Sequence, residues 1–309
     1  MAQPLEGKAA VVTGSGRGIG RGIAKAFAAA GASVVVCDFG GALDGTGEAK
    51  TPADEVVKEI KDAGGAAVAC YENVSSMEGG ERIIQTCVDN FGKIDILVTV
   101  AGILRDRMVF NMTEEEWDAV IAVHLKGTFT CVKYASILMR QQRGGRIITF
   151  SSSSGVMGTT GQTNYGAAKS GIAGLTKVVA RDLGKYGVTA NSILPSADTR
   201  MTQTDEIKRA REIRIGLGLP EWEAEGPQLP EDIAPFIVYL ASDKASNVNG
   251  QTFSVRGNII ALVSQPRIIA AVTKEGRWTV DELIDQAPRT LGKGVVNEYQ
   301  PKPEKAAAG

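Results

Sequence analysis

The sequence contains little histidine, little cysteine and no excess of either charge. His124 is the one histidine in 309 residues, which argues against a zinc-dependent alcohol dehydrogenase and leaves little room for a serine–histidine hydrolase. Four cysteines, at Cys37, Cys70, Cys87 and Cys131, have the spacing of neither a disulfide framework nor a zinc site. We therefore expect cysteines that are small core residues in a reducing compartment, and no metal ligands.

Charged clusters and long apolar runs are also lacking. There are 34 basic and 35 acidic residues, and the formal net charge is −1, which gives no reason to expect nucleic acid or an anionic membrane as a partner. No apolar run is long enough to span a bilayer, and the N-terminus has no basic stretch followed by an apolar core. We expect a cytoplasmic protein.

What the sequence does contain is a regular alternation of strand and helix patterns. We predict strands at residues 8–13, 33–37, 66–70, 94–100, 146–150 and 189–194, and a last strand at 251–255. Helices are predicted at residues 18–30, 51–63, 75–90, 113–142, 164–183 and 230–241. This alternation predicts an α/β fold with a doubly wound parallel sheet, Rossmann-like, which binds ligands at the carboxyl ends of its strands.

Two segments interrupt this alternation, and a third follows it. Residues 40–50 are polar and glycine-rich and predict a long surface loop. Residues 199–230 are interrupted by Gly and Pro, and they form either a mobile flap over the pocket or an ordinary excursion. We predict one catalytic domain over residues 1–257 and an appended C-terminal extension over 258–309 with a flexible end.

A glycine turn follows the first predicted strand and opens the first predicted helix. Gly14, Gly18 and Gly20 permit a tight turn whose backbone N–H groups can approach a phosphate at the helix N-terminus. Arg17 and Ile19 lie within this turn, so we include them among the nucleotide-binding residues. The arrangement of strand, glycine turn and helix predicts a bound dinucleotide.

An acidic residue at the end of the second strand favours one form of this cofactor. Asp38 follows Gly20 by eighteen residues, near the spacing at which a carboxylate meets the adenosine ribose hydroxyls. Its charge would repel a 2′-phosphate and so favours NAD over NADP, although Arg17 could pair with such a phosphate. An ordinary strand-end acid is the alternative. Loops after two further strands place Asn73, Val74, Ala101 and Gly102 where they would also face the cofactor.

A serine run, a tyrosine and a lysine form the candidate catalytic group. Tyr165 and Lys169 are four residues apart on a predicted helix and therefore share one face. A cation near the phenol is expected to lower its pKa from about 10 towards the range of a general base, and Ser152 could hold the substrate oxygen. Taken alone, this spacing is more often a surface pair, and a serine run is more often a loop.

The combination of these motifs resembles the short-chain dehydrogenase/reductase family from about residue 5 to residue 257. Thr13-Gly14-x-x-x-Gly18-x-Gly20 is similar to its cofactor motif, and Ser152, Tyr165 and Lys169 match its catalytic residues. The resemblance implies an oxidoreductase that interconverts a secondary alcohol and a ketone. In it, Tyr165 is the general acid/base, Lys169 lowers the phenol pKa and holds the nicotinamide ribose, and Ser152 positions the substrate oxygen.

The sequence departs from the family pattern at three places. His124 stands where the family usually has an asparagine that supports a proton-relay water, so it either supports the relay or is a buried structural residue. The usual Asn-Asn-Ala-Gly is replaced at residues 99–102, which affects a contact that stabilises the sheet. The usual Pro-Gly is Pro195-Ser196 here, and the resemblance implies nicotinamide contacts from Pro195 and Thr199.

Segments 38–41, 102–107, 123–127 and 200–204 resemble a narrower branch, the (3R)-hydroxyacyl-CoA and hydroxysteroid dehydrogenases. This implies a hydroxyacyl-CoA or a hydroxysteroid as the small-molecule substrate. A broad-specificity carbonyl reductase for xenobiotics or terpenoids is the alternative with the same chemistry, and a non-catalytic dinucleotide sensor is the remote one. The alanine-rich helix after Tyr165 pairs across subunits in this family, which implies a homodimer or homotetramer.

Overall fold

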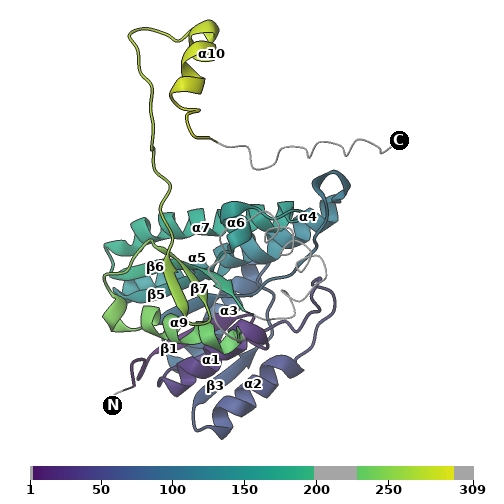
Figure 1. Cartoon of the computed structure of the whole chain (residues 1–309). Coiled ribbons are helices and arrows are strands. Elements are labelled where there is room, and N and C mark those ends of the chain that lie inside the picture. The colour runs from purple at the N-terminus through teal and green to yellow at the C-terminus, as the bar shows by residue number, and fades with distance from the viewer. Residues whose placement is uncertain (1–2, 198–227, 296–309) are drawn as a thin grey trace. The chain divides into compact units, whose positions relative to one another are not determined.

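The structure is a computed structural model that describes residues 3–197 and 228–295. The chain forms two units that divide after Ser264, and each is described by itself (Figure 1). The first unit contains a sheet of eight strands in the order β3-β2-β1-β4-β5-β6-β7-β8. Its strands are β1 Ala9–Thr13, β2 Ser33–Cys37, β3 Ala66–Cys70, β4 Ile96–Thr99, β5 Gly145–Phe150, β6 Val188–Ser196, β7 Thr252–Arg256 and β8 Ile259–Leu262.

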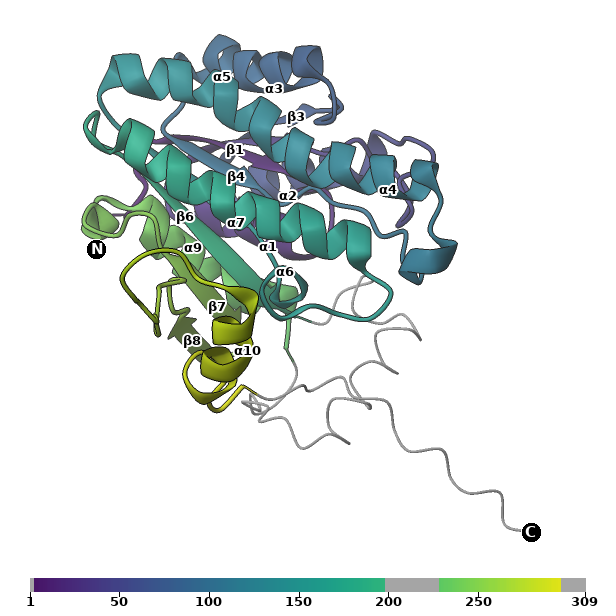
Figure 2. The same cartoon turned by 90° about the horizontal axis from the view of Figure 1, so that it is seen from above.

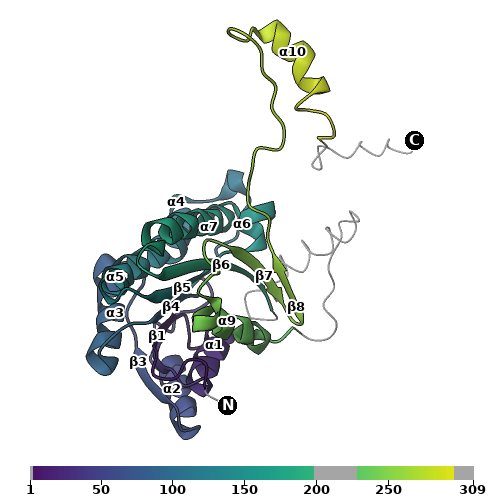
Figure 3. The same ribbon diagram turned by 90° about the vertical axis from the view of Figure 1, so that its left-hand side faces the viewer.

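Helices cover both faces of this sheet (Figure 2, Figure 3). On one face lie α1 Gly18–Ala29, α2 Thr51–Asp62 and α9 Ala234–Ala241, and on the other lie α3 Met77–Phe91, α5 Gly127–Gln142 and α7 Thr163–Gly184. Two apolar cores result, one around Phe27 and Ile237 and one around Ile83 and Met139. Strands β1, β2 and β4 at the centre of the fold are almost wholly buried, which explains their largely apolar sequences.

Shorter helical elements complete the first unit. They are η1 Val109–Asn111, α4 Glu114–Ile121, η2 Ala122–Lys126, α6 Ser153–Met157, η3 Pro230–Ile233 and η4 Asp243–Ala245. Helix α4 begins with the predicted capping box, in which Thr113 and Glu116 bond each other's backbone N–H groups. The second unit contains α10 Val280–Arg289, whose apolar Val280, Leu283 and Ile284 are exposed within that unit.

The doubly wound fold is confirmed, and the topology fixes where a ligand can bind. The strand order reverses between β1 and β4, where Thr13 and Thr99 are register partners at the carboxyl ends. A crevice opens outside the sheet at such a switch point because neighbouring chain connections leave in opposite directions. The loops after β1, β2, β3 and β4 all meet at this edge.

Three predictions about the elements need correction. The strand expected to be the last is followed by β8, which pairs antiparallel to β7 through a turn at residues 257–258. The helix predicted over residues 113–142 contains a π-helical segment, η2, because an extra residue widens the turn there. Strand β6 continues through Pro195 to Ser196. The proposed flap lies almost wholly outside the described residues.

All four cysteines are buried and free, as predicted for small core residues. In the part of the chain that the structure describes, none of the helices combines the length and the hydrophobicity that a membrane span requires.

Candidate active site

The glycine turn after β1 lies in close contact with the backbone that follows β4. Gly14 has φ +66°, and a Cβ on it would lie 2.7 Å from the Cα and N atoms of Ala101. A Cβ on Gly20 would lie 2.2 Å from the carbonyl oxygen of Gly14. Only glycine fits at both positions, because the obstructing atoms are backbone. The sequence motif therefore has a steric cause in this structure.

The first turn of α1 suits an anion. Arg17 is the N-cap and makes no side-chain cap hydrogen bond, and the first turn carries no acidic side chain. The first N–H groups of a helix have no intrahelical partner and carry the positive end of the helix dipole. These features fit the pyrophosphate of a dinucleotide.

A cavity of about 510 Å³ lies over this turn at the carboxyl ends of the strands. Its walls include ten of the residues that we predicted to bind the cofactor: Gly14, Arg17, Gly18, Ile19, Gly20, Asp38, Asn73, Val74, Ala101 and Gly102. The insertion at residues 40–50 also contributes to the wall through Gly40, Gly41, Ala42 and Gly45. The volume and the exposed backbone donors fit a nucleotide.

The carboxylate of Asp38 is held at the end of β2 by two backbone donors. Its Oδ2 accepts a hydrogen bond of 2.8 Å from the N–H of Gly16, and its Oδ1 accepts one of 2.7 Å from the N–H of Gly40. Nη1 of Arg17 donates to the carbonyl oxygen of Gly41 at 3.4 Å. The acid is therefore oriented at the cavity wall by the glycine turn and by the start of the insertion.

Helix α7 and the N-terminus of α6 bring the predicted catalytic residues together. Ser152 is the N-cap of α6 and accepts a hydrogen bond from the N–H of Ser154, and its hydroxyl lies close enough to the phenol of Tyr165 to lower the phenol pKa. Nζ of Lys169 lies 5.4 Å from the centre of the Tyr165 ring. It donates a hydrogen bond of 2.7 Å to the carbonyl oxygen of Phe150 at the end of β5. The surface-pair alternative does not apply, because Lys169 is buried.

The phenol pKa differs from our expectation. Burial raises the pKa of Tyr165 to about 12, a smaller opposing effect comes from the hydrogen bond with Ser152, and the charge of Asp106 adds to the rise. Burial also lowers the pKa of the Lys169 ammonium to about 7, so that this amine is only partly charged at neutral pH. Lys169 is not among the causes of the shift at Tyr165, so the lowering of the phenol pKa by Lys169 stays a prediction.

The buried amine makes stability depend on pH. The unfolded chain keeps this lysine protonated up to a pKa of 10.5, whereas the folded protein releases the proton at about 7. Between these values the unfolded state binds more protons, so the free energy of unfolding should rise with pH. We expect Lys169→Met to reduce this rise in denaturant titrations at pH 7 and pH 9. An unchanged rise in the variant would contradict the assignment, since Tyr165 titrates above this window.

His124 lies in η2 and is 1% exposed. Its Nε2 lies 3.0 Å from the N atom and 2.8 Å from the O atom of Ile103, and its ring packs edge-on against Tyr165 with the centroids 5.1 Å apart. Burial and the charge of Lys169 lower its pKa to about 3, so the ring is neutral. These contacts support the structural alternative, and a role in proton relay stays a prediction.

We also predicted cofactor contacts from Tyr165 and Lys169, and neither residue lines the cavity. The other two predicted residues fall outside the cavity or outside the described residues. Pro195 is half-buried in β6, where it pairs in register with Val255 of β7 and does not line the cavity. Thr199 lies outside the residues that the structure describes.

Sequence reasoning missed Asn164, which is fully buried directly before Tyr165. Its Nδ2 donates to the carbonyl oxygens of Arg105 at 2.9 Å and Glu116 at 3.0 Å, and its Oδ1 accepts from the N–H of Tyr165 at 2.7 Å. A buried amide at the first turn of a helix is a weak signal, because Asn is common at helix N-termini.

Comparisons with known proteins agree with this geometry. Residues 14–257 match the family model described as enoyl-(acyl carrier protein) reductase. The hydroxyacyl-CoA dehydrogenase ChsB1 of Mycobacterium tuberculosis is 41% identical over 288 residues, which cover 90% of this chain and 87% of that protein. The peroxisomal multifunctional enzyme type 2 of Mus musculus is 40% identical over 277 residues, which cover 89% of this chain and only 35% of the mouse enzyme.

A solved structure is similar over almost the whole chain. It is the crystal structure of a short chain dehydrogenase from Mycobacterium avium, with a TM-score of 0.79 and 41% sequence identity, and the match covers 94% of this chain and 96% of that one. The glycine turn, the cavity and the cluster of Ser152, Tyr165 and Lys169 lie within the matched family region. The chain therefore belongs to the short-chain dehydrogenase/reductase family, and it is an oxidoreductase that uses a nicotinamide dinucleotide on a small-molecule substrate.

Proposed function

We propose that this protein interconverts the hydroxyl and the ketone of a 3-hydroxyacyl-CoA with NAD. The observation that carries the proposal is the convergence of Ser152, Tyr165 and Lys169 beside the nucleotide cavity. The names of two relatives support the acyl-CoA substrate, since one is a hydroxyacyl-CoA dehydrogenase and the other a peroxisomal multifunctional enzyme. Val156 and Met157 of α6, which are 53% and 54% exposed, follow Ser152 closely and offer apolar surface to an acyl chain.

When bound, a nicotinamide dinucleotide would supply or accept the hydride. During reduction, Tyr165 donates its proton to the ketone oxygen, and a phenol with a pKa of about 12 is fully protonated and ready for this at neutral pH. The Ser152 hydroxyl acts on the phenol pKa, so it lies near the phenol and can hold the same substrate oxygen. Two donors fixed at the oxygen on which charge develops stabilise the transition state without reorganising.

Lys169 has two tasks in this proposal. Its bond to the carbonyl oxygen of Phe150 fixes Nζ 5.4 Å from the centre of the Tyr165 ring, and its remaining N–H groups can hold the nicotinamide ribose. Because burial lowers its pKa to about 7, binding of electron-rich ribose oxygens favours the charged form. That charge in turn assists proton release from Tyr165 during alcohol oxidation.

A panel of substrates tests the proposed function. Acyl-CoA, hydroxysteroid and small-ketone substrates are each offered with NAD or NADH, and the absorbance of the reduced nicotinamide is followed. We expect the highest kcat/KM for a 3-hydroxyacyl-CoA or its ketone. A higher value for steroids, terpenoids or small ketones would replace the acyl-CoA proposal, and no turnover with any substrate would favour a dinucleotide sensor.

NAD preference is the next prediction. We expect Kd for NADH to be at least about tenfold lower than for NADPH, because the Asp38 carboxylate at the cavity wall repels a 2′-phosphate. Asp38→Asn should narrow this ratio by removing the charge, and it should also weaken NADH binding somewhat, because an amide can accept only one of the two backbone N–H bonds that the carboxylate accepts. Fluorescence titration of wild type and variant measures both constants. Tighter binding of NADPH by the wild type would show that Arg17, and not Asp38, decides the choice.

We also propose that the protein is a homodimer or homotetramer. Helices α4, α5 and α7 expose apolar side chains, namely Trp117 at 37%, Phe129 at 44%, Ile137 at 41% and Val178 at 58%. A Cβ on Gly174 of α7 would meet nothing within 4 Å, so a second helix could approach closely there. Light scattering should give two or four times 32.5 kDa, and Phe129→Arg should lower that mass. A monomeric wild type at micromolar concentration would reject the assembly.

A further inference from the structure

We propose that residues 103–105 link the cofactor pocket to the catalytic tyrosine, and that Arg105 and Asn164 are the positioning residues of this link. The inference deepens the proposed function and rests on it. Residues 103–105 form hydrogen bonds with three segments. These are the loop at residues 40–50, the N-terminus of α7, and η2. We call residues 40–50 the insertion loop.

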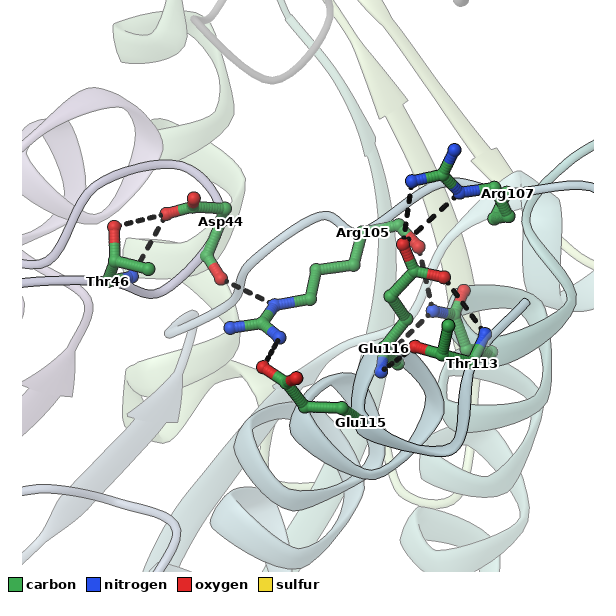
Figure 4. A network of polar contacts seen from close by, with 8 residues as sticks. Asp44, Thr46, Arg105, Arg107, Thr113, Glu115 and Glu116 are labelled. Atoms are coloured by element: carbon green, nitrogen blue, oxygen red, sulfur yellow. Dashed lines mark hydrogen bonds and ion pairs between the residues drawn. The ribbon is translucent and has the colours of Figure 1, made fainter. Parts of the chain in front are cut away.

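The insertion loop is attached to this link on the cofactor side (Figure 4). The N–H of Leu104 donates to the carbonyl oxygen of Leu43 at 3.0 Å, and Nε of Arg105 donates to the carbonyl oxygen of Asp44 at 2.9 Å. A Cβ on Gly45 would lie 3.0 Å from Cδ1 of Ile103, so the loop also packs on the link. The insertion loop forms part of the cavity wall. A nucleotide bound in the cavity therefore limits the movement of the loop residues to which Arg105 is bonded.

Arg105 is itself fixed by a second partner. Its Nη1 donates to Oε1 of Glu115 at 2.9 Å, and its side chain is 19% exposed. Figure 4 shows the guanidinium between the carbonyl of Asp44 and the carboxylate of Glu115, at the start of α4. A planar guanidinium with two partners on different elements fixes their separation better than a single-point donor. The insertion loop and α4 are thereby held together.

The catalytic side of the link is the buried amide of Asn164. Its Nδ2 donates hydrogen bonds to the carbonyl oxygens of Arg105 and Glu116, and its Oδ1 accepts one from the N–H of Tyr165. One side chain therefore connects residues 103–105, α4 and α7. His124 provides a parallel contact, since its Nε2 bonds the backbone of Ile103 while its ring packs against the Tyr165 ring. The position of the phenol therefore depends on where residues 103–105 lie.

The chain of contacts predicts how substitutions behave. Arg105→Gln removes the positive charge and the guanidinium that bonds both Asp44 and Glu115. We expect a higher KM for NADH and about tenfold lower kcat, because small displacements of a reacting group have large effects on rate. Arg105→Lys should recover part of both. Asn164→Ala should lower kcat with little change in cofactor affinity. In the Asn164→Ala background, Arg105→Gln should still change the cofactor KM but should lower kcat much less than in the wild type, because only the His124 contact then joins the link to Tyr165.

Arg107→Gln is the matched control. The Arg107 guanidinium pairs with Glu116 and is 55% exposed, and its side-chain hydrogen bonds do not reach the insertion loop. We expect kcat and KM within about twofold of wild type. The link is rejected if Arg105→Gln and Asn164→Ala lower kcat independently, if Arg105→Gln affects the cofactor KM alone, or if Arg107→Gln has the same effect as Arg105→Gln.

Amide hydrogen exchange tests the link without any substrate. NADH should protect both the insertion loop and the N–H of Tyr165 in the wild type. In Arg105→Gln and Arg105→Lys, each first shown to melt cooperatively, protection of the insertion loop should remain while that of Tyr165 falls. Equal protection of Tyr165 in all three proteins would overturn the proposal. A failed substrate panel would leave this readout intact, so the two proposals fail separately.

Discussion

Tyr165→Phe is expected to lower kcat about a thousandfold, which is the range that proton transfer by a placed acid contributes. Only the phenol oxygen is removed, and the ring stays packed against His124. Binding of NADH should be nearly unchanged, because Tyr165 does not line the nucleotide cavity. Steady-state assays with the best substrate of the panel, together with fluorescence titration of NADH, measure both effects.

Tyr134→Phe is the control for this substitution. The Tyr134 phenol lies on α5 and faces Glu81, away from the catalytic group. Its loss should leave kcat unchanged. Turnover by Tyr165→Phe at a rate near that of the wild type would disprove the mechanism, because the proton could then not come from the Tyr165 phenol.

Gly14→Ala is expected to weaken NADH binding about a hundredfold. A side chain at φ +66° is strained, and its Cβ would meet the backbone of Ala101 at 2.7 Å, which cannot rotate away. Strand β4 and the glycine turn would have to separate, and the backbone donors for the pyrophosphate would shift. A change of this size corresponds to about 3 kcal/mol of binding free energy. Calorimetric titration with NADH measures it.

Gly7→Ala is the control that separates the backbone strain of a positive φ from the steric clash of the new Cβ. Gly7 has nearly the same φ, +68°, and a Cβ there would meet nothing within 4 Å. It should lose about 1 to 2 kcal/mol of stability and bind NADH as the wild type does. If Gly14→Ala also binds NADH normally, the close approach of the turn to Ala101 has no part in forming the nucleotide site.

The sequence alone determined those features that depend on neighbouring residues. The strands over residues 33–37 and 66–70 agree with the structure residue for residue, because unbroken apolar runs bounded by turns are local signals. The glycine turn and the capping box at Thr113 also follow from short-range geometry. The boundary at residue 257, the flexible end, the substrate flap and the cytoplasmic location stay predictions from sequence.

Only the tertiary structure decided the properties of the catalytic group. The i, i+4 spacing brought Tyr165 and Lys169 together, but burial among distant segments raises one pKa to about 12 and lowers the other to about 7. The bond between Asn164 and Arg105 joins residues 59 positions apart, and the bond between Arg105 and Asp44 spans 61. Desolvation and contacts over such separations exist only once the sheet has assembled, so no local pattern contains them.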